Sequence, residues 1–406
     1  MSNSSKTLPW SRPAEIREEE PERFPPDLLQ QPPGARQEYF ERQCLIEHPR
    51  LLEALDAAMG AMCPPGEGAS VRRPGTMMLV IGPSRVGKTT FIRLLEKRLL
   101  EQSRAQMEQD PGFIPFASMT AAGPDTSRFD WQTYYRAVLR GLQDPFLDGK
   151  TARIPTRELR EAMEAALLQR KPIAVIVDEA HHFAKATSGR RLQDQLDHLK
   201  YFENLTGVSH ILVGTYEMRP FRMVNAQLAC RSIDIHFPRY DASKAEDCQV
   251  FQSVLWALQR QLPVEEEPLL TQQCWEFLYT RSIGCIGLLK LHLNRALSVA
   301  LREGARTIRL SHLQQTAMSE SRVALALRNA VESEAELVEA EGADERLLTL
   351  LGLRAKPASL KPQTSRMEEE QKPDKPAPRS QKRPGQRSEG RDAIFQSLSG
   401  EEQVAG

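Results

Sequence analysis

Short apolar runs alternate with helical patterns along the first half of the chain. The runs Met77–Ile81 and Ile173–Val177 are apolar throughout, as expected for central strands of a parallel sheet that is covered on both faces. Further strands are predicted at Phe113–Ala117, His210–Val213 and Ile233–Phe237.

The segments between these strands carry apolar residues at helical spacing. The pattern predicts helices over Thr89–Glu101 and Trp131–Leu142, and one apolar stripe runs from Leu192 through Leu196 and Leu199 to Phe202. Strands that alternate with helices predict an α/β domain of three layers around a parallel sheet.

After Asp241 the strand pattern ends and only helical patterns follow. They cover Lys244–Arg260, Leu269–Tyr279, Leu288–Leu301 and Ser311–Val331. We therefore predict a mobile proline-rich arm over 1–36, an α/β core over 37–240, a small helical domain over 241–350 and a disordered tail over 351–406. The tail is basic and proline-rich, and its apolar cluster Ile394–Leu398 suggests a peptide that binds a partner.

Composition narrows the class of protein. The 406 residues include 54 Lys and Arg against 54 Asp and Glu, so a uniformly basic coat is excluded and contact with nucleic acid requires a local patch. Apolar runs reach about five residues, well short of the roughly 20 that a membrane helix needs. The N-terminus lacks a secretory signal, and the scattered cysteines have no C-x-x-C pair, so we expect reduced thiols and a cytoplasmic location.

The strongest motif follows the first apolar run and opens a helix. It reads G-x-x-x-x-G-K-T, the P-loop pattern, in which backbone N–H groups and a helix N-terminus face phosphate oxygens. Lys88 is expected to reach the β- and γ-phosphates of ATP, and Thr89 to bind Mg²⁺. The predicted nucleotide-binding set is Gly82, Pro83, Ser84, Arg85, Val86, Gly87, Lys88, Thr89 and Thr90.

Polar side chains after later strands complete the predicted site. Asp178 is placed to hold the ligand shell of Mg²⁺ from a second side, in addition to Thr89. Glu179 is placed to orient and deprotonate the attacking water. Thr215, at the tip of a neighbouring strand, can bond that water or the γ-phosphate. Arg231 is the first candidate for an arginine finger that reaches a neighbouring subunit's γ-phosphate, with Arg222 as the second.

The string Asp-Glu-Ala-His continues with a second histidine. It suggests a helicase, but the chain has neither a second motor domain nor a Gln-x-x-Gly-Arg-x-x-Arg motif. A zinc site at His181 and His182 is not expected, because adjacent side chains diverge on a helix. We expect these histidines to flank the site structurally.

The chain resembles the AAA+ ATPases in the order of its features: the P-loop between a strand and a helix, the strand that ends in Asp178, the strand before Thr215, the Arg231 segment and the C-terminal helices. Ile46-Glu47-His48-Pro49, the phrase Asp-Glu-Ala-His-His, Leu199–Leu205 and Leu212–Thr215 further resemble the TniB/TnsC family of transposon-encoded AAA+ ATPases, over roughly residues 40–330. Membership implies ATP-dependent rings or filaments around duplex DNA, a target-selector partner and recruitment of a transposase.

One stretch departs from the AAA+ pattern. Where many AAA+ proteins carry a lid arginine that touches the γ-phosphate, residues 282–290 contain none. The contact is therefore absent or supplied by Lys290.

Contact with the DNA backbone requires cations or hydroxyl groups. The best local cluster is Lys185, Ser188, Arg190 and Arg191, followed by Lys150 and Arg153. A AAA+ helicase loader or replication initiator would share every site residue, and a nucleotide-gated scaffold with negligible turnover stays a third alternative.

Overall fold

The computed structural model describes residues 21–62, 75–123, 129–148, 154–185, 190–222 and 232–337, together with Leu348, Leu351 and Leu353. The side chains of residues 184, 185, 190 and 191 are outside this description. The chain divides into two compact units, Met1–Glu339 and Ala340–Gly406. The features below belong to the first unit.

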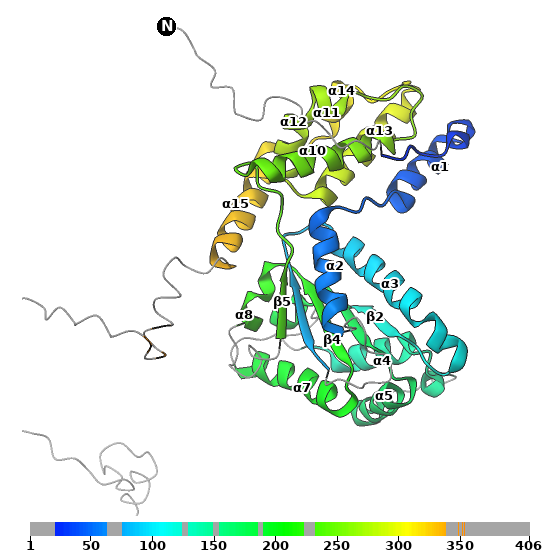
Figure 1. The fold of residues 1–406 in the computed structure, drawn as a ribbon, viewed down its shortest axis with the longest axis vertical. Helices are drawn as coiled ribbons and strands as arrows, with labels where there is room; N and C mark the ends of the chain where they lie inside the picture. The colour runs from blue at the N-terminus through cyan, green and yellow to red at the C-terminus, as the bar shows by residue number, and fades with distance from the viewer. Residues whose placement is uncertain are drawn as a thin grey trace, which may run out of the picture. The chain divides into compact units, whose positions relative to one another are not determined.

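A parallel sheet of five strands forms the centre of the α/β part (Figure 1). Its strands, in the order β2-β3-β4-β1-β5, are β1 Met77–Ile81, β2 Phe116–Thr120, β3 Ala174–Asp178, β4 Ser209–Gly214 and β5 Ser232–His236. Each predicted strand is present. The sequence placed β2 three residues too early, because the register is set by pairing Phe116 with Ala174 on β3 and not by the apolar Phe113.

Helices cover both faces of the sheet. One face carries α2 (Pro49–Met62) and α3 (Lys88–Gln109); the other carries α4 (Trp131–Gly141), α5 (Thr156–Arg170) and α7 (Arg190–Thr206) (Figure 1).

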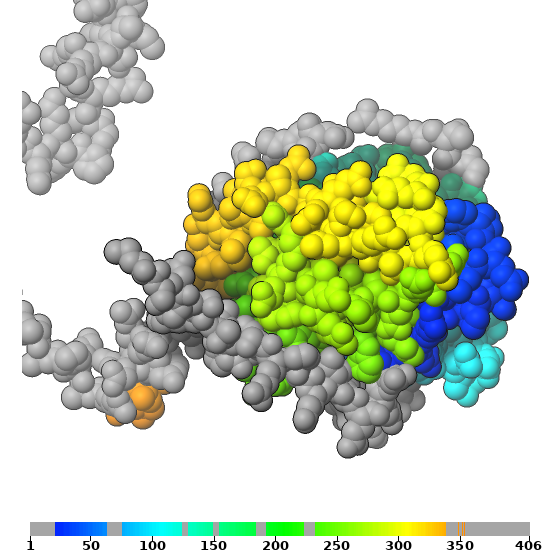
Figure 2. Space-filling view, turned by 90° about the horizontal axis from the view of Figure 1, so that it is seen from above, coloured from blue at the N-terminus to red at the C-terminus, as the bar shows by residue number. Residues whose placement is uncertain are grey.

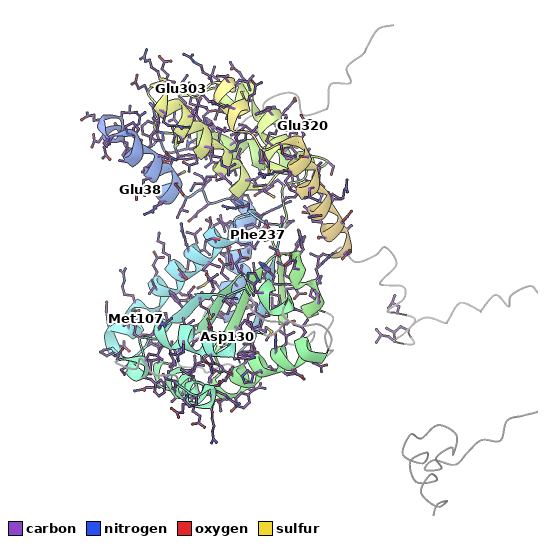
Figure 3. All side chains as sticks on the ribbon, turned by 180° about the vertical axis from the view of Figure 1, so that it is seen from behind. Glu38, Met107, Asp130, Phe237, Glu303 and Glu320 are labelled. Carbon is purple, nitrogen blue, oxygen red and sulfur yellow. The ribbon has the colours of Figure 1, made fainter. Side chains whose placement is uncertain are left out.

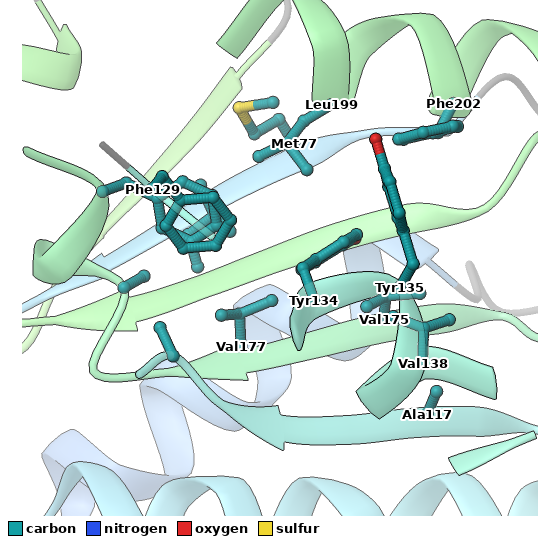
Figure 4. Close-up of a cluster of buried hydrophobic side chains, with 14 of the residues drawn as sticks. Met77, Ala117, Phe129, Tyr134, Tyr135, Val138, Val175, Val177, Leu199 and Phe202 are labelled. Carbon is teal, nitrogen blue, oxygen red and sulfur yellow. The ribbon is translucent and has the colours of Figure 1, made fainter. Parts of the chain in front are cut away.

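Successive residues of a strand point to opposite faces. Met77 and Leu79 of β1 therefore pack in one buried cluster, while Met78 and Val80 pack in the other. Figure 4 shows the first cluster, in which Tyr134 of α4 lies against the sheet. This confirms the three-layer α/β prediction.

The α4 helix has a side-chain cap that fixes its start. The Asp130 side chain (Figure 3) accepts hydrogen bonds from the backbone N–H groups of Gln132 and Thr133, which satisfies donors that would otherwise lack a helical partner. Small elements connect the layers: η3 Pro145–Leu147, α6 His181–Lys185, η4 Tyr216–Met218 and α8 Arg219–Arg222.

Only helices follow β5 in the described residues, as the pattern predicts. They are α10 Ala245–Arg260, α11 Leu270–Gln273, α12 Trp275–Ser282, α13 Ile286–Arg302, α14 Leu310–Thr316 and α15 Glu320–Leu337. Two predicted helices are each divided in two, at Cys274 and at the extended residue Ala317. No glycine or proline marks either break, so tertiary packing decides it.

Residues 21–36 differ from the predicted mobile arm. They include η1 (Pro26–Gln30) and the start of α1 (Pro33–Glu38), and the Phe24 side chain is buried. The Phe24 N–H donates to the carbonyl of Arg260, and the Arg36 guanidinium donates to the carbonyl of Pro263. The N-terminal segment thus packs against the helical part, beside which it lies in Figure 2.

No single helix among the described residues is long and apolar enough to cross a membrane. The helices α12 and α13 meet the criterion only as a pair, and they are bent by 117° at their junction.

Candidate functional site

The loop after β1 is shaped by close approaches that only glycine allows. A Cβ atom on Gly82 would lie 2.2 Å from the carbonyl oxygen of Phe237, the residue that follows β5 and is labelled in Figure 3. Gly87 has φ 129°, which L side chains rarely adopt, and it caps the N-terminus of α3. Both glycines of the motif are therefore required by the fold of the loop.

The Lys88 side chain lies inside this loop. It is only 7% exposed, and its Nζ donates to the carbonyl oxygens of Gly82, at 3.2 Å, and Pro83, at 2.8 Å. Burial lowers its pKa to about 8, and the charges of Glu179 and Asp178 oppose this shift. Lys88 thus remains a cation near pH 7 and faces the two acids predicted for the site.

The other residues of the loop and the start of α3 differ in exposure. Ser84, Arg85 and Thr89 are exposed, whereas Val86 is buried in the core. Thr89 is at the second position of α3, directly after Lys88. Its hydroxyl and the Asp178 carboxylate are oxygen donors of the kind that Mg²⁺ prefers.

The two adjacent acids end β3 in different conformations. Asp178 is half-buried; burial raises the pKa of its carboxyl, while the charge of Lys88 acts in the opposite direction. The N–H of Glu179 donates to Asp178 Oδ1 at 2.8 Å. Glu179 itself has φ 53°, a left-handed conformation that is uncommon outside glycine and that ends the extended strand.

Thr215 follows β4, which lies between β1 and β3 in the sheet. Its Oγ1 is a buried atom for which the described residues supply no hydrogen-bond partner. An unpaired buried hydroxyl costs free energy unless a ligand or water satisfies it. The atom is thus available to a polar ligand at the carboxyl edge of the sheet.

The histidines after Glu179 lie together, contrary to the expectation that their side chains diverge. The ring centroids of His181 and His182 are 4.4 Å apart. One donor atom from each of Glu179, His181 and His182 lies within 4.8 Å of the other two. Because α6 begins at His181, the turn at Glu179 brings all three side chains to one place. Sequence spacing alone did not reveal this cluster.

The helical part reaches the loop through the start of α13. A Cβ atom on Gly287 would lie 2.3 Å from the carbonyl oxygen of Arg85. The preceding Cys285 is fully buried; burial raises the pKa of its thiol to about 12, so it stays neutral. The helical part, called the lid below, therefore meets the loop through an uncharged, closely packed surface.

Lys290 lies on the same helix but binds elsewhere. Its Nζ donates to the carbonyl oxygens of Glu41, at 2.9 Å, and Cys44, at 2.6 Å. Its ammonium group is thus paired with the N-terminal segment, and the suggestion that it replaces the missing lid arginine finds no support in these contacts.

The segment around His48, which is part of the TniB/TnsC-like sequence Ile46–Pro49, forms a further contact with the helical part. His48 is buried, and its Nδ1 lies 2.9 Å from the hydroxyl of Tyr240. Arg50 bonds Asp247 at 2.7 Å, with both side chains mostly buried. These contacts join the start of α2 and the residue before it to the connection after β5 and to α10.

The two candidates for the arginine finger have different outcomes. Arg222 forms an ion pair with Asp234 of β5 in its own chain, which opposes a role in a neighbouring subunit. Arg231 lies outside the described residues.

The predicted DNA contacts stay untested. Lys150, Arg153 and Ser188 are outside the described residues, as are the side chains of Lys185, Arg190 and Arg191.

Comparisons with known proteins agree with the parallel sheet and the P-loop described above. Residues 71–221 match the family described as an AAA domain. No curated protein matches the chain. The fold is similar to that of the Aeropyrum pernix ORC2 protein in its ADP form, with a TM-score of 0.50 and 15% identity over 78% of this chain and 90% of that chain.

Two further structures are similar at lower scores. ORC2 of Aeropyrum pernix in ADPNP-ADP complexes has a TM-score of 0.48 at 15% identity, covering 79% of this chain and 86% of that one. Cdc6p from Pyrobaculum aerophilum has 0.42 at 14% identity, covering 71% and 73%. The AAA domain match, the similarity to the ADP form of ORC2 and the five-stranded parallel sheet together show the AAA+ P-loop ATPase fold with a helical C-terminal part, as predicted.

Proposed function

We propose that this protein binds ATP with Mg²⁺ and hydrolyses it. One observation carries the proposal. Lys88, Asp178 and Thr215 follow or end three neighbouring strands, β1, β3 and β4, at their carboxyl ends. The Lys88 side chain is buried in the loop, and Thr215 presents a buried hydroxyl without a partner in the described residues. In parallel α/β sheets, this edge is where ligands bind.

Each side chain has a role that its position supports. Lys88 exchanges the carbonyls of Gly82 and Pro83 for phosphate oxygens, which form stronger, charge-assisted bonds. Asp178 and Thr89 would hold Mg²⁺, which neutralises charge on the phosphates when bound.

Glu179 accepts a proton from the attacking water, and Thr215 bonds this water or the γ-phosphate. These two groups act at the reacting end of the triphosphate. They make the proposal one of hydrolysis and not of binding alone.

The site is completed by a second copy of the chain. Arg231 is proposed to reach the γ-phosphate bound to a neighbouring subunit, where a guanidinium stabilises charge that develops during transfer. The protein therefore acts as a homo-oligomer whose assembly depends on ATP.

The biological output supported by the sequence resemblance is control of DNA transposition. The oligomer, a ring or a filament, would surround duplex DNA, receive a signal from a target-selector protein and recruit a transposase. Backbone contacts from Lys185, Ser188, Arg190 and Arg191, or from Lys150 and Arg153, are proposed to hold the DNA without reading its sequence.

A second candidate function follows from the fold comparison. The similarity to ORC2 of Aeropyrum pernix favours a replication initiator or helicase loader with the same nucleotide site. Affinity capture from the native host with ATP and DNA present separates the two. Recovery of an integrase-type transposase supports transposition, whereas recovery of a replicative helicase supports the second function.

Substitution of Lys88 tests the nucleotide site. Removal of a charge-assisted bond costs roughly 1.5–3 kcal/mol, so Lys88→Ala should weaken MgATP binding at least about tenfold and abolish ATP-dependent assembly on DNA. The matched control is Lys97→Ala on the same helix, where the side chain is 69% exposed and lies 3.9 Å from Glu101. Assembly of the Lys88 variant at the control's level would contradict the proposal.

Glu179→Gln distinguishes an ATPase from a scaffold that uses ATP only as a latch. If the protein is an ATPase, the variant should lose turnover and stay assembled on DNA in the presence of ATP, because hydrolysis no longer releases the oligomer. A latch should behave like the unmodified protein in both measurements.

A further inference from the structure

His181 occupies a buried position between two carboxylates. Its side chain is only 7% exposed. Nδ1 lies 3.2 Å from Glu179 Oε2, and Nε2 lies 3.8 Å from Glu217 Oε2. Both ring nitrogens therefore lie near carboxylate oxygens. The approach to Glu179 is the closer one, whereas the 3.8 Å separation from Glu217 is a charge contact longer than a hydrogen bond.

The two carboxylates are far more exposed than the ring. The Glu179 side chain is 43% exposed and that of Glu217 is 52% exposed. A long, exposed carboxylate samples several rotamers, whereas a buried imidazole is held by its surroundings. The ring can thus orient Glu179, and the reverse is not expected.

The backbone around His181 is anchored to the neighbouring strand. The N–H of Ala180 donates to the carbonyl of Val213 on β4 at 2.9 Å. A Cβ atom on Gly214 would lie 3.1 Å from the backbone nitrogen of His181 and 2.3 Å from Met218 Sδ, so these segments are in close contact. The ring position is therefore set by the packing of α6 against η4.

This packing links both reactive side chains of the proposed site. Glu217 is two residues after Thr215, and both follow β4. His181 thus connects the acid at the end of β3 with the segment that carries the buried hydroxyl. A change in either segment would alter the direction in which Glu179 points.

We propose that His181 is a positioning residue, which holds the Glu179 carboxylate toward the attacking water and fixes it to the Glu217 segment. The inference rests on the proposed function, since it assigns a role to a residue that acts through Glu179. His181 neither touches the nucleotide nor accepts the water proton.

The test separates turnover from binding. His181→Ala should lower kcat for ATP about 10- to 100-fold, because a misdirected base loses part of its catalytic effect. Affinity for MgATP and the thermal midpoint should change little, with binding within about twofold. His181→Asn keeps a donor close to the Nδ1 position and should recover a substantial part of the rate. Equal rates for the Ala and Asn variants would overturn the proposal.

A double-mutant cycle shows whether His181 acts through Glu179. In the Glu179→Gln background, addition of His181→Ala should cause no further loss of rate, because the two residues act as a unit. Additive losses would overturn the inference. If Glu179→Gln alone leaves turnover intact, the proposed function fails; if it abolishes turnover while His181→Ala has no effect, only the positioning role fails.

His182→Ala is the matched control, because its donor belongs to the same cluster and could join a metal site. The positioning role requires that this variant retain its rate and that a zinc-selective chelator leave the unmodified protein active. Loss of activity in both experiments would make the histidines metal ligands and overturn the proposal.

Discussion

Gly287 of α13 lies directly against Arg85 of the P-loop: a Cβ atom on the glycine would come within 2.3 Å of the arginine's carbonyl oxygen. The lid and the nucleotide loop are thus in contact through backbone, and no side chain can be added between them without displacing one of the two.

Gly287→Ala should therefore weaken nucleotide binding. We expect about a tenfold loss of MgATP affinity, measured by titration with a fluorescent analogue, because the added methyl group must move the loop or the helix. Gly60→Ala in α2 is the control, since no atom lies within 4 Å of its Cβ position. That variant should retain affinity and gain about 0.5–1 kcal/mol of stability. Unchanged affinity in the Gly287 variant would show that the contact is irrelevant to binding.

Lys290→Met should affect stability and not nucleotide affinity. Its ammonium bonds the carbonyls of Glu41 and Cys44, so we expect a loss of about 1–3 kcal/mol in the free energy of unfolding. MgATP affinity should stay within about twofold. Lys244→Met, an exposed lysine that precedes α10, controls for loss of charge. A large loss of affinity with unchanged stability would instead identify Lys290 as the lid cation.

Glu334→Ala should destabilise the contact of α15 with the α/β part. Glu334 Oε2 lies 3.1 Å from Arg239 Nε, and the two side chains are only 18% and 9% exposed. Removal of the acid leaves a buried guanidinium unpaired, at a cost of about 2–4 kcal/mol in chemical unfolding. Glu332→Ala, on the exposed side of the same helix, should cost almost nothing. Similar losses in both variants would exclude a specific role for the ion pair.

The stability should fall as the pH decreases from about 6.5 to 4. Burial lowers the pKa of His48 to about 4, with a smaller contribution from the charge of Arg50. Because the unfolded chain binds the proton more readily in this range, acid favours unfolding. The full effect of this group is about 3 kcal/mol at most.

His48→Asn, which retains a hydrogen-bonding group near the Tyr240 hydroxyl, should make unfolding less dependent on pH between 7 and 4.5. Urea unfolding at both pH values measures the difference. If the variant loses as much stability as the unmodified protein on acidification, other groups determine the acid sensitivity.

Local sequence was sufficient to predict the elements whose burial or backbone conformation depends on neighbouring residues alone. Apolar runs specify β1 and the larger part of β3 and β4, because a strand covered on both faces is mostly apolar. The spacing of Gly82, Gly87 and Lys88 specifies the nucleotide loop, because the backbone at the two glycines excludes larger side chains. These features depend on a few neighbouring residues, so a single sequence contains them.

Contacts between distant segments were decided by the tertiary structure. Residues 21–36 are proline-rich, yet Phe24 is buried beside the end of α10, a partner more than 200 residues away. Lys290 likewise bonds the carbonyl of Cys44, which is distant in the sequence, because α13 packs against the N-terminal segment. His181 meets Glu217 only because β3 and β4 are adjacent in the sheet. Periodicity reports which face of an element is buried, but the identity of the neighbour depends on how the elements pack.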